Sequence, residues 1–92
     1  MIKISIPTAL RKYCQELATV DVQAANVGEA LQALVRAHPA LNNHLMDAQG
    51  KLRSFVNVYL GEEDVRNLDR EATAVTAGDE ILIIPAIAGG AH

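Results

Sequence analysis

The stretch "NVGEALQALVRAH", residues 26–38, marks the place where the hydrophobic period of the chain changes from two to about 3.6. Asn26 is a residue type that caps helix N-termini, Glu29 follows three positions later, and Pro39 closes the segment. The polar segment 39–51 is expected to form a helical turn followed by a loop. The sequence therefore predicts one main helix, whose apolar residues at helical spacing are Val27, Leu31, Leu34 and Val35.

Two strand patterns precede this helix. In "IKISI", residues 2–6, isoleucines alternate with Lys3 and Ser5, which is typical of a strand covered on one face, and Pro7 ends the pattern. In "VDV", residues 20–22, two valines flank an aspartate and indicate a second short strand. We expect the two strands to pair across the intervening loop.

Three further extended segments follow the helix. "FVNVYL", residues 55–60, is a strong strand pattern, and "GEED", residues 61–64, is a turn that leads into a short segment at Val65. Residues 72–75 are expected to be a short extended piece. "AGDEILIIP", residues 77–85, contains a turn and then four consecutive apolar residues, which favour a strand in the middle of a sheet.

The order strand, strand, helix, strand, short strand, strand is that of a β-grasp fold, an α+β architecture in which a mixed sheet curls around one main helix. Its first and last strands lie side by side and parallel in the centre of the sheet. We expect one domain over residues 1–88 and a flexible tail over 89–92. The helix residues should pack against Ile4, Ile6, Val58 and one face of residues 81–84.

Composition restricts the classes of protein to which the chain can belong. Half of its 92 residues are apolar but only one Phe and two Tyr are aromatic, so the core must be aliphatic. The net charge of −3 and the absence of a basic run argue against a nucleic-acid partner. No apolar run approaches the roughly 18 residues of a membrane span. Without a signal peptide, and with Cys14 as the single cysteine, a cytoplasmic protein is expected.

Three stretches carry a resemblance to a known family: "IKISIPTALR" at residues 2–11, "LRSFVNVYLGEEDVR" at 52–66 and "AGDEILIIPAIAGG" at 77–90. Together they resemble the ubiquitin-like sulfur carrier family typified by MoaD and ThiS, and within it the CysO-type carriers of cysteine biosynthesis. The resemblance covers nearly the whole chain in order. A terminal Gly-Gly pair alone is weak evidence, but one that follows "GDE", an apolar strand and Pro85 in a domain of about 90 residues is strong evidence for such a carrier.

The resemblance implies that the chain is a protein co-substrate and no enzyme. An adenylating enzyme of the E1-like, MoeB or ThiF type would use ATP to activate the carboxylate of Gly90, and sulfide or a persulfide would then displace AMP and leave a thiocarboxylate. The chain itself would bind no cofactor. Gly89 and Gly90 lack a Cβ and can pass through a narrow channel, while Ile87 and Ala88 would lie extended along a partner's groove.

The sequence departs from the family pattern at its end, because Ala91 and His92 follow Gly90. Some carriers of this family have such extensions, and a JAMM-type zinc protease cuts them off, here between Gly90 and Ala91. The alternative is that the two residues are a cloning remnant.

Three functions are compatible with this resemblance. In the first, sulfur passes to a PLP-dependent sulfhydrylase or synthase that makes cysteine or a related metabolite, and the same protease releases the product. The second is the small subunit of molybdopterin synthase. The third is a ubiquitin-like module for protein conjugation or scaffolding.

An exposed apolar patch is expected on the sheet face opposite the helix. In residues 55–60, Phe55 and Tyr59 share a face with Asn57, and a single helix can cover only one side of a sheet. Such a patch would dock the activating enzyme. The alternative is a second minor core under loops.

The remaining candidate groups are interpreted as structural. Cys14 has no evident basic neighbour beyond Arg11 and Lys12, so an incidental or structural thiol is favoured. His38, His44 and His92 lack the spacing of metal ligands, and no metal site is expected. The acidic residues 62–64 are interpreted as a solvated turn, with contact to a basic partner as the alternative.

Overall fold

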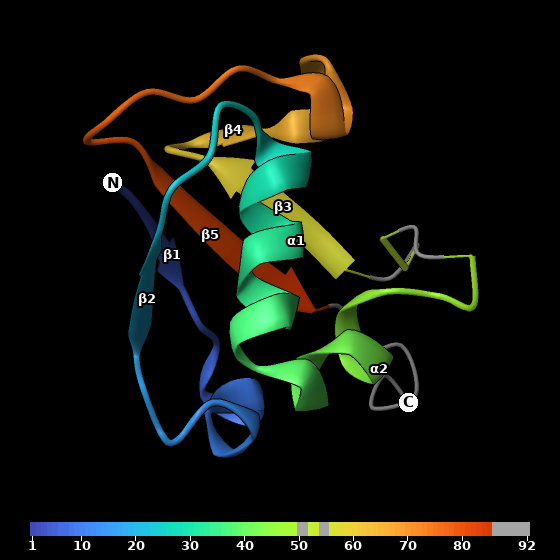
Figure 1. Ribbon diagram of the computed structural model, residues 1–92. Coiled ribbons are helices and arrows are strands. Elements are labelled where there is room, and N and C mark those ends of the chain that lie inside the picture. Colours follow the sequence, from blue (N-terminus) through green and yellow to red (C-terminus); the bar gives the residue numbers. More distant parts are fainter. Residues whose placement is uncertain (50–51, 54–55, 86–92) are drawn as a thin grey trace.

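A mixed sheet of five strands packs one face against a single main helix in the computed structural model of the protein, which describes residues 1–49, 52–53 and 56–85 (Figure 1). The strands are β1 (Ile2–Ser5), β2 (Thr19–Val22), β3 (Val56–Leu60), β4 (Glu63–Asp64) and β5 (Glu80–Pro85). The α-helices are α1 (Val27–Ala37) and α2 (Asn42–Leu45). Four short 3-10 helices complete the described elements: η1 (Thr8–Tyr13), η2 (Pro39–Leu41), η3 (Val65–Asn67) and η4 (Arg70–Ala72).

The strand order across the sheet is β2-β1-β5-β3-β4. β1 and β5 run parallel, with Ile4 opposite Ile81, and every other neighbouring pair is antiparallel. The first and last strands of the chain therefore lie side by side at the centre, as the sequence predicts. This arrangement confirms the β-grasp fold.

Helix α1 begins where the sequence places its start, because Asn26 caps it. The Asn26 Oδ1 accepts a hydrogen bond of 2.8 Å from the backbone N–H of Glu29. The Glu29 carboxylate in turn accepts one of 2.9 Å from the N–H of Ala25. These two bonds satisfy N–H groups that have no partner within the helix.

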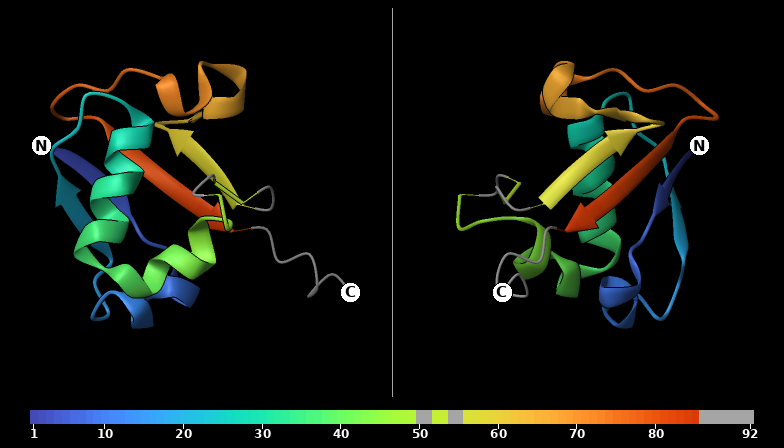
Figure 2. Two further views of the ribbon diagram at one scale, coloured as in Figure 1. Left: turned by 45° about the vertical axis from the view of Figure 1, so that its right-hand side comes forward. Right: turned by 180° about the vertical axis from the view of Figure 1, so that it is seen from behind.

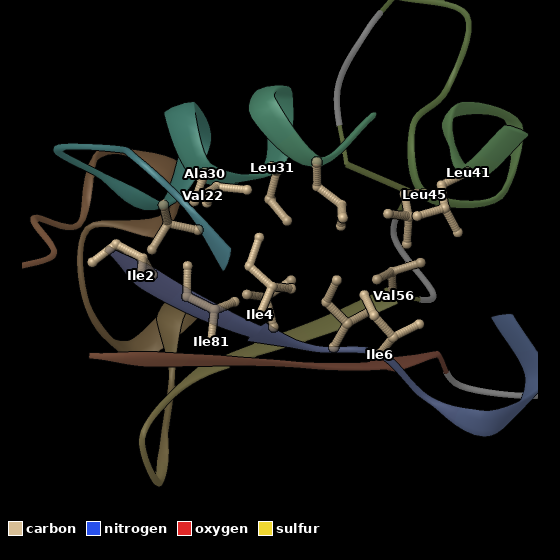
Figure 3. Close-up of a cluster of buried hydrophobic side chains, with 14 of the residues drawn as sticks. Ile2, Ile4, Ile6, Val22, Ala30, Leu31, Leu41, Leu45, Val56 and Ile81 are labelled. Atoms are coloured by element: carbon tan, nitrogen blue, oxygen red, sulfur yellow. The ribbon is translucent and has the colours of Figure 1, made fainter. Parts of the chain in front are cut away.

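The core lies between α1 and the covered face of the sheet (Figure 3). Leu31 and Leu34 of α1 are fully buried, as are Ile4 and Ile81 of the two central strands. Alternation along each strand sends every second side chain into this layer, which agrees with the period-two pattern. Of the helix residues expected in the core, Val35 is only half-buried and packs at its margin.

The connections differ in three places from what the sequence indicates. Residues 72–75 do not form an extended strand: Ala72 ends η4, and Ala74 makes an isolated bridge with Asn26. The loop after β1 contains η1. The segment after α1 is less exposed than its polar composition suggests, because Leu41 and Leu45 close the end of the core.

We expect Asn26→Ala to lower the free energy of unfolding by about 1 kcal/mol, since it leaves the Glu29 N–H unpaired. Asn26→Gly should cost only a few tenths of that amount. Urea unfolding followed by circular dichroism measures both. The control is Gln32→Ala on the exposed side of α1. Equal stability of Asn26→Ala and the wild type would contradict the role of the cap.

Candidate functional site

Strand β5 is the rigid base from which the C-terminal segment leaves the domain. It is paired with β1 as far as Leu82 and with β3 as far as Pro85, which lies opposite Val56. Backbone hydrogen bonds on both sides make a central strand the least mobile part of a sheet. β5 therefore sets the direction in which the chain leaves the sheet after Pro85.

Most of the site residues that the sequence predicts lie outside the described part of the structure. These are Gly89 and Gly90, the partner-binding residues Ile87 and Ala88, the processing position Ala91, and Phe55 in the patch. Their assignments remain predictions from the sequence. Of the predicted site residues, the structure places Tyr59.

Tyr59 belongs to an apolar patch on the open face of the sheet, the side without a covering helix among the described elements (Figure 2, right). Its neighbour across the strand pair is Leu82, and Ile84 lies two residues further along β5 on the same face. Ile84 is 41% exposed, and Tyr59 and Leu82 are half-buried. We call these three residues the open-face patch.

Leu82 and Ile84 are site candidates that reasoning from the sequence did not name. The signal was present, because residues 81–84 are four consecutive apolar residues in a strand that alternates between two faces. Ile81 and Ile83 are buried under α1, which leaves the other two on the open face. The pairing with β3 then places them beside Tyr59.

The acidic residues 62–64 have a structural explanation in part. Glu62 is exposed, and Glu63 and Asp64 form β4. The Asp64 carboxylate accepts a hydrogen bond of 2.9 Å from the N–H of Arg66, which caps η3, and lies 3.9 Å from the guanidinium of Arg66. The predicted solvated turn is therefore limited to Glu62, since Glu63 and Asp64 pair with β3 as strand residues, and contact with a basic partner stays a prediction.

Cys14 is a core residue. Its side chain is fully buried, and its thiol donates to the carbonyl oxygens of Leu10 and Leu17 at 3.8 and 3.7 Å. Burial raises the pKa of the thiol above its ordinary value of 9.0. Such a thiol is protonated near neutral pH, and this environment suits packing better than nucleophilic chemistry.

Of the described histidines, His44 packs against an aromatic ring. His44 stacks on the ring of Tyr13 with a centroid distance of 4.1 Å. Within residues 1–49, 52–53 and 56–85, no three His, Cys, Asp or Glu side chains come together in a way that could hold a metal ion. Nor does this part of the chain contain a helix with the length and apolar character needed to cross a bilayer.

Comparison with known proteins relates this geometry to one family. The model of the ThiS family matches residues 4–90, which include the second half of β1, the other four described strands, α1 and the Gly-Gly pair. The match ends at Gly90 and leaves Ala91 and His92 outside it.

Individual relatives cover most of the chain. The sulfur carrier protein CysO of Mycobacterium tuberculosis is 37% identical over 97% of this chain and 98% of its own length. Small archaeal modifier protein 1 of Haloferax volcanii is 44% identical over 77% of this chain and 78% of its own. Among solved structures, a chain of the Amycolatopsis orientalis BexX/CysO complex superposes with a TM-score of 0.87, at 34% identity over 98% of this chain and all of that one.

The raised pKa of Cys14 makes stability depend on pH in the alkaline range. The unfolded thiol loses its proton above about pH 9, while the folded thiol keeps it, so stability is complete below the unfolded pKa and falls as the pH rises toward the folded pKa. We expect the free energy of unfolding to fall more steeply between pH 8.5 and 10.5 in the wild type than in Cys14→Ala. If the free energy of unfolding falls equally steeply with pH in both proteins, the prediction is wrong. The cavity in Cys14→Ala lowers stability by the same amount at every pH and does not change this slope.

Proposed function

The chain belongs to the ThiS family as a sulfur carrier protein of the CysO type, and we propose that it holds its sulfur as a thiocarboxylate on Gly90. The observation that carries the proposal is the family match, which runs through the whole fold and ends at Gly90. The central position of β5 in the sheet supports the choice of the glycine pair that follows it as the reactive end.

The chemistry has two steps, both performed on the tail by a partner enzyme. A carboxylate is a poor electrophile, so the adenylating enzyme first joins the Gly90 carboxylate to the α-phosphate of ATP and releases pyrophosphate. Sulfide then attacks the acyl carbon, the bond to AMP breaks, and a thiocarboxylate remains. A persulfide would instead leave an acyl disulfide, which a thiol must cleave to give the thiocarboxylate and a new disulfide. The carrier supplies a reactive group in place of catalytic residues and binds no cofactor itself. We place this ATP-dependent reaction in the cytoplasm.

Ala91 and His92 must be removed before this chemistry can begin. As long as Ala91 follows Gly90, the carboxyl group of Gly90 is part of a peptide bond and cannot be adenylated. We propose that a JAMM-type zinc protease cuts after Gly90. The sulfur then passes to a PLP-dependent sulfhydrylase or synthase in the formation of cysteine or a related metabolite, as in the CysO type.

The open-face patch is the proposed docking surface for the adenylating enzyme. Tyr59, Leu82 and Ile84 lie on β3 and β5, so a protein bound to them is held close to the point where the tail leaves the sheet. An amphipathic tyrosine beside exposed aliphatic side chains is a composition enriched at protein interfaces.

A second candidate function is protein conjugation. It is supported by the similarity to an archaeal protein named as a modifier. Both functions begin with the same adenylated glycine and differ in the nucleophile: sulfide in one case, and the amine of a lysine in the other. Transfer of sulfur regenerates or releases a free carrier, whereas conjugation leaves the carrier attached through an isopeptide bond, so intact mass distinguishes them.

We expect a chain that ends at Gly90 to gain about 16 Da with an adenylating enzyme, ATP and sulfide, as one oxygen is replaced by sulfur. The full-length chain should not change, because its Gly90 carboxyl group is part of a peptide bond. Mass spectrometry of the intact proteins measures both, and omission of ATP is the control. If both chains gain this mass, the extension does not prevent activation. Gain by neither, with an enzyme proven active on another carrier, would count against the proposed function.

We expect Tyr59→Ala and Ile84→Ser, in the chain that ends at Gly90, to raise the KM for adenylation by about tenfold each, the range typical of truncated interface anchors. Asp21→Asn on β2 is the control, since it changes an exposed residue at the far edge of the same sheet. Thermal melting of each variant separates lost docking from lost stability. Unchanged kinetics in both patch variants would show that the enzyme binds elsewhere.

A further inference from the structure

A cavity of about 550 Å³ lies along one flank of α1, between this helix and the segment that follows α2. Its apolar walls include Leu31, which is fully buried, together with Met46 and Leu52. Met46 and Leu52 are joined by an antiparallel bridge, so the wall opposite the helix is held in place. The volume is in the range of sites that take up a ligand or an anchoring side chain of a partner.

One end of this cavity carries two carboxylates. Glu29 belongs to the first turn of α1, Glu71 belongs to η4, and both line the cavity. Gly28 lets η4 come this close to the helix, because a Cβ at this position would lie 3.2 Å from both the Cβ and the carbonyl oxygen of Glu71. The fold thus gathers two like charges at the start of α1.

Neither carboxylate is fully used within the fold. The Oε1 of Glu29 accepts the hydrogen bond from Ala25, and its second oxygen has no hydrogen-bond partner among the described residues. Glu71 makes no hydrogen bond or ion pair in that part of the chain. Arg70, the preceding residue, forms no ion pair with Glu71, and its single charge can offset only one of the two carboxylates. At least one negative charge therefore remains for a ligand.

Arg36 lines the cavity near the other end of α1. It is exposed, lies in the last turn of the helix, and makes no hydrogen bond or ion pair with another described residue. Arg36 follows Glu29 by seven positions, or about 10 Å along the helix axis, whereas side chains that pair on a helix are three or four positions apart. The uncharged Gln32 lies between them along the cavity. The cavity therefore has unpaired charges of opposite sign at its two ends and apolar walls between them.

A matching ligand has to offer a cation, an apolar group and an anion in this order. In an extended peptide, side chains at alternate positions point to the same side, and the first and fifth residues lie about 13 Å apart. The long side chains of lysine and glutamate at these two positions can reach charges that are about 10 Å apart on a helix. The middle residue would then insert an aliphatic side chain between Leu31, Met46 and Leu52.

We propose that this cavity binds an extended segment of a partner protein in which a basic, an aliphatic and an acidic residue stand at alternate positions. The aliphatic residue is the anchor, because it is the group that the apolar walls remove from water. The two charges fix the direction of the segment: its basic residue lies at Glu29 and Glu71, and its acidic residue lies at Arg36.

This contact goes beyond the proposed function and does not depend on it. It uses no residue of the C-terminal segment and none of the open-face patch. The cavity lies along α1, and this helix covers the face of the sheet opposite the patch. A partner in the cavity and an enzyme on the open face can therefore hold the domain at the same time.

The probe is the capped peptide acetyl-Lys-Ser-Leu-Ser-Glu-amide, titrated into the ¹⁵N-labelled full-length protein and followed by two-dimensional ¹H–¹⁵N NMR. It should shift the backbone resonances of residues 28–36, 46 and 71. Two control peptides each lack one feature: acetyl-Gln-Ser-Leu-Ser-Gln-amide has no charges, and acetyl-Lys-Ser-Ser-Ser-Glu-amide has no anchor. Each control peptide should bind about tenfold more weakly than the probe.

Substitutions at the two ends of the cavity test the direction of the segment. Arg36→Glu should weaken binding of the probe about fivefold and strengthen binding of acetyl-Lys-Ser-Leu-Ser-Lys-amide by about the same factor. Glu71→Gln should weaken binding of the probe about threefold, since Glu29 remains. Both substituted residues are exposed, so the melting temperature should not change. The matched controls are Lys12→Glu on η1 and Glu80→Gln on β5, which should bind the probe as the wild type does.

A changed peptide preference in Arg36→Glu, together with unchanged binding in Lys12→Glu and Glu80→Gln, would support the proposal. Four results would overturn it: no shifts with the probe, shifts spread over all charged residues, equal binding by either control peptide, or unchanged binding in Arg36→Glu. A stronger response to free L-lysine, which carries both charges on one small molecule, would overturn a protein segment as the occupant. None of these measurements uses an adenylating enzyme, so their outcome is independent of the proposed function.

Discussion

The parallel pairing of β1 with β5 is the constraint on which the rest of the structure depends. It brings the first and last strands of the chain together at the centre of the sheet, so the fold cannot close until nearly the whole domain is present. The layer of Ile4, Ile81 and Leu31 makes this closure favourable, because all three side chains are removed from water at one place. β2 and the β3-β4 pair then extend the sheet on its two sides.

The same constraint connects stability with function. β5 is hydrogen-bonded on both sides as far as Leu82 and to β3 as far as Pro85, and under the proposed function it supports the segment that carries the reactive glycine. Under the proposed function the tail enters another protein, so it cannot also contribute to the core. Substitutions in the tail should therefore change reactivity with little effect on folding, while those under α1 should do the reverse.

The surface of the domain has an apolar part and a charged part. On the open face, Tyr59, Leu82 and Ile84 present apolar area, and on the side of α1 carboxylates and a guanidinium line a cavity. Apolar contact favours affinity, whereas charged contact favours rate of encounter and correct orientation. Under the proposed function both kinds of contact are useful, because each partner enzyme has to bind the same tail and then release it.

The sequence by itself determined the order of the strands along the chain, the helix with its cap at Asn26, and the place of the Gly-Gly pair after the last strand, because period, capping and residue type are local properties of the chain. Tertiary structure alone decided which surfaces the domain presents. Leu82 and Ile84 become neighbours of Tyr59 only through the β3-β5 register, and Glu29, Glu71 and Arg36 line one cavity only after η4 and the segment that follows α2 fold back along α1. The conformation of Arg70, with a φ of +55°, had no local signal either, since arginine adopts a left-handed backbone only where the surrounding contacts enforce it.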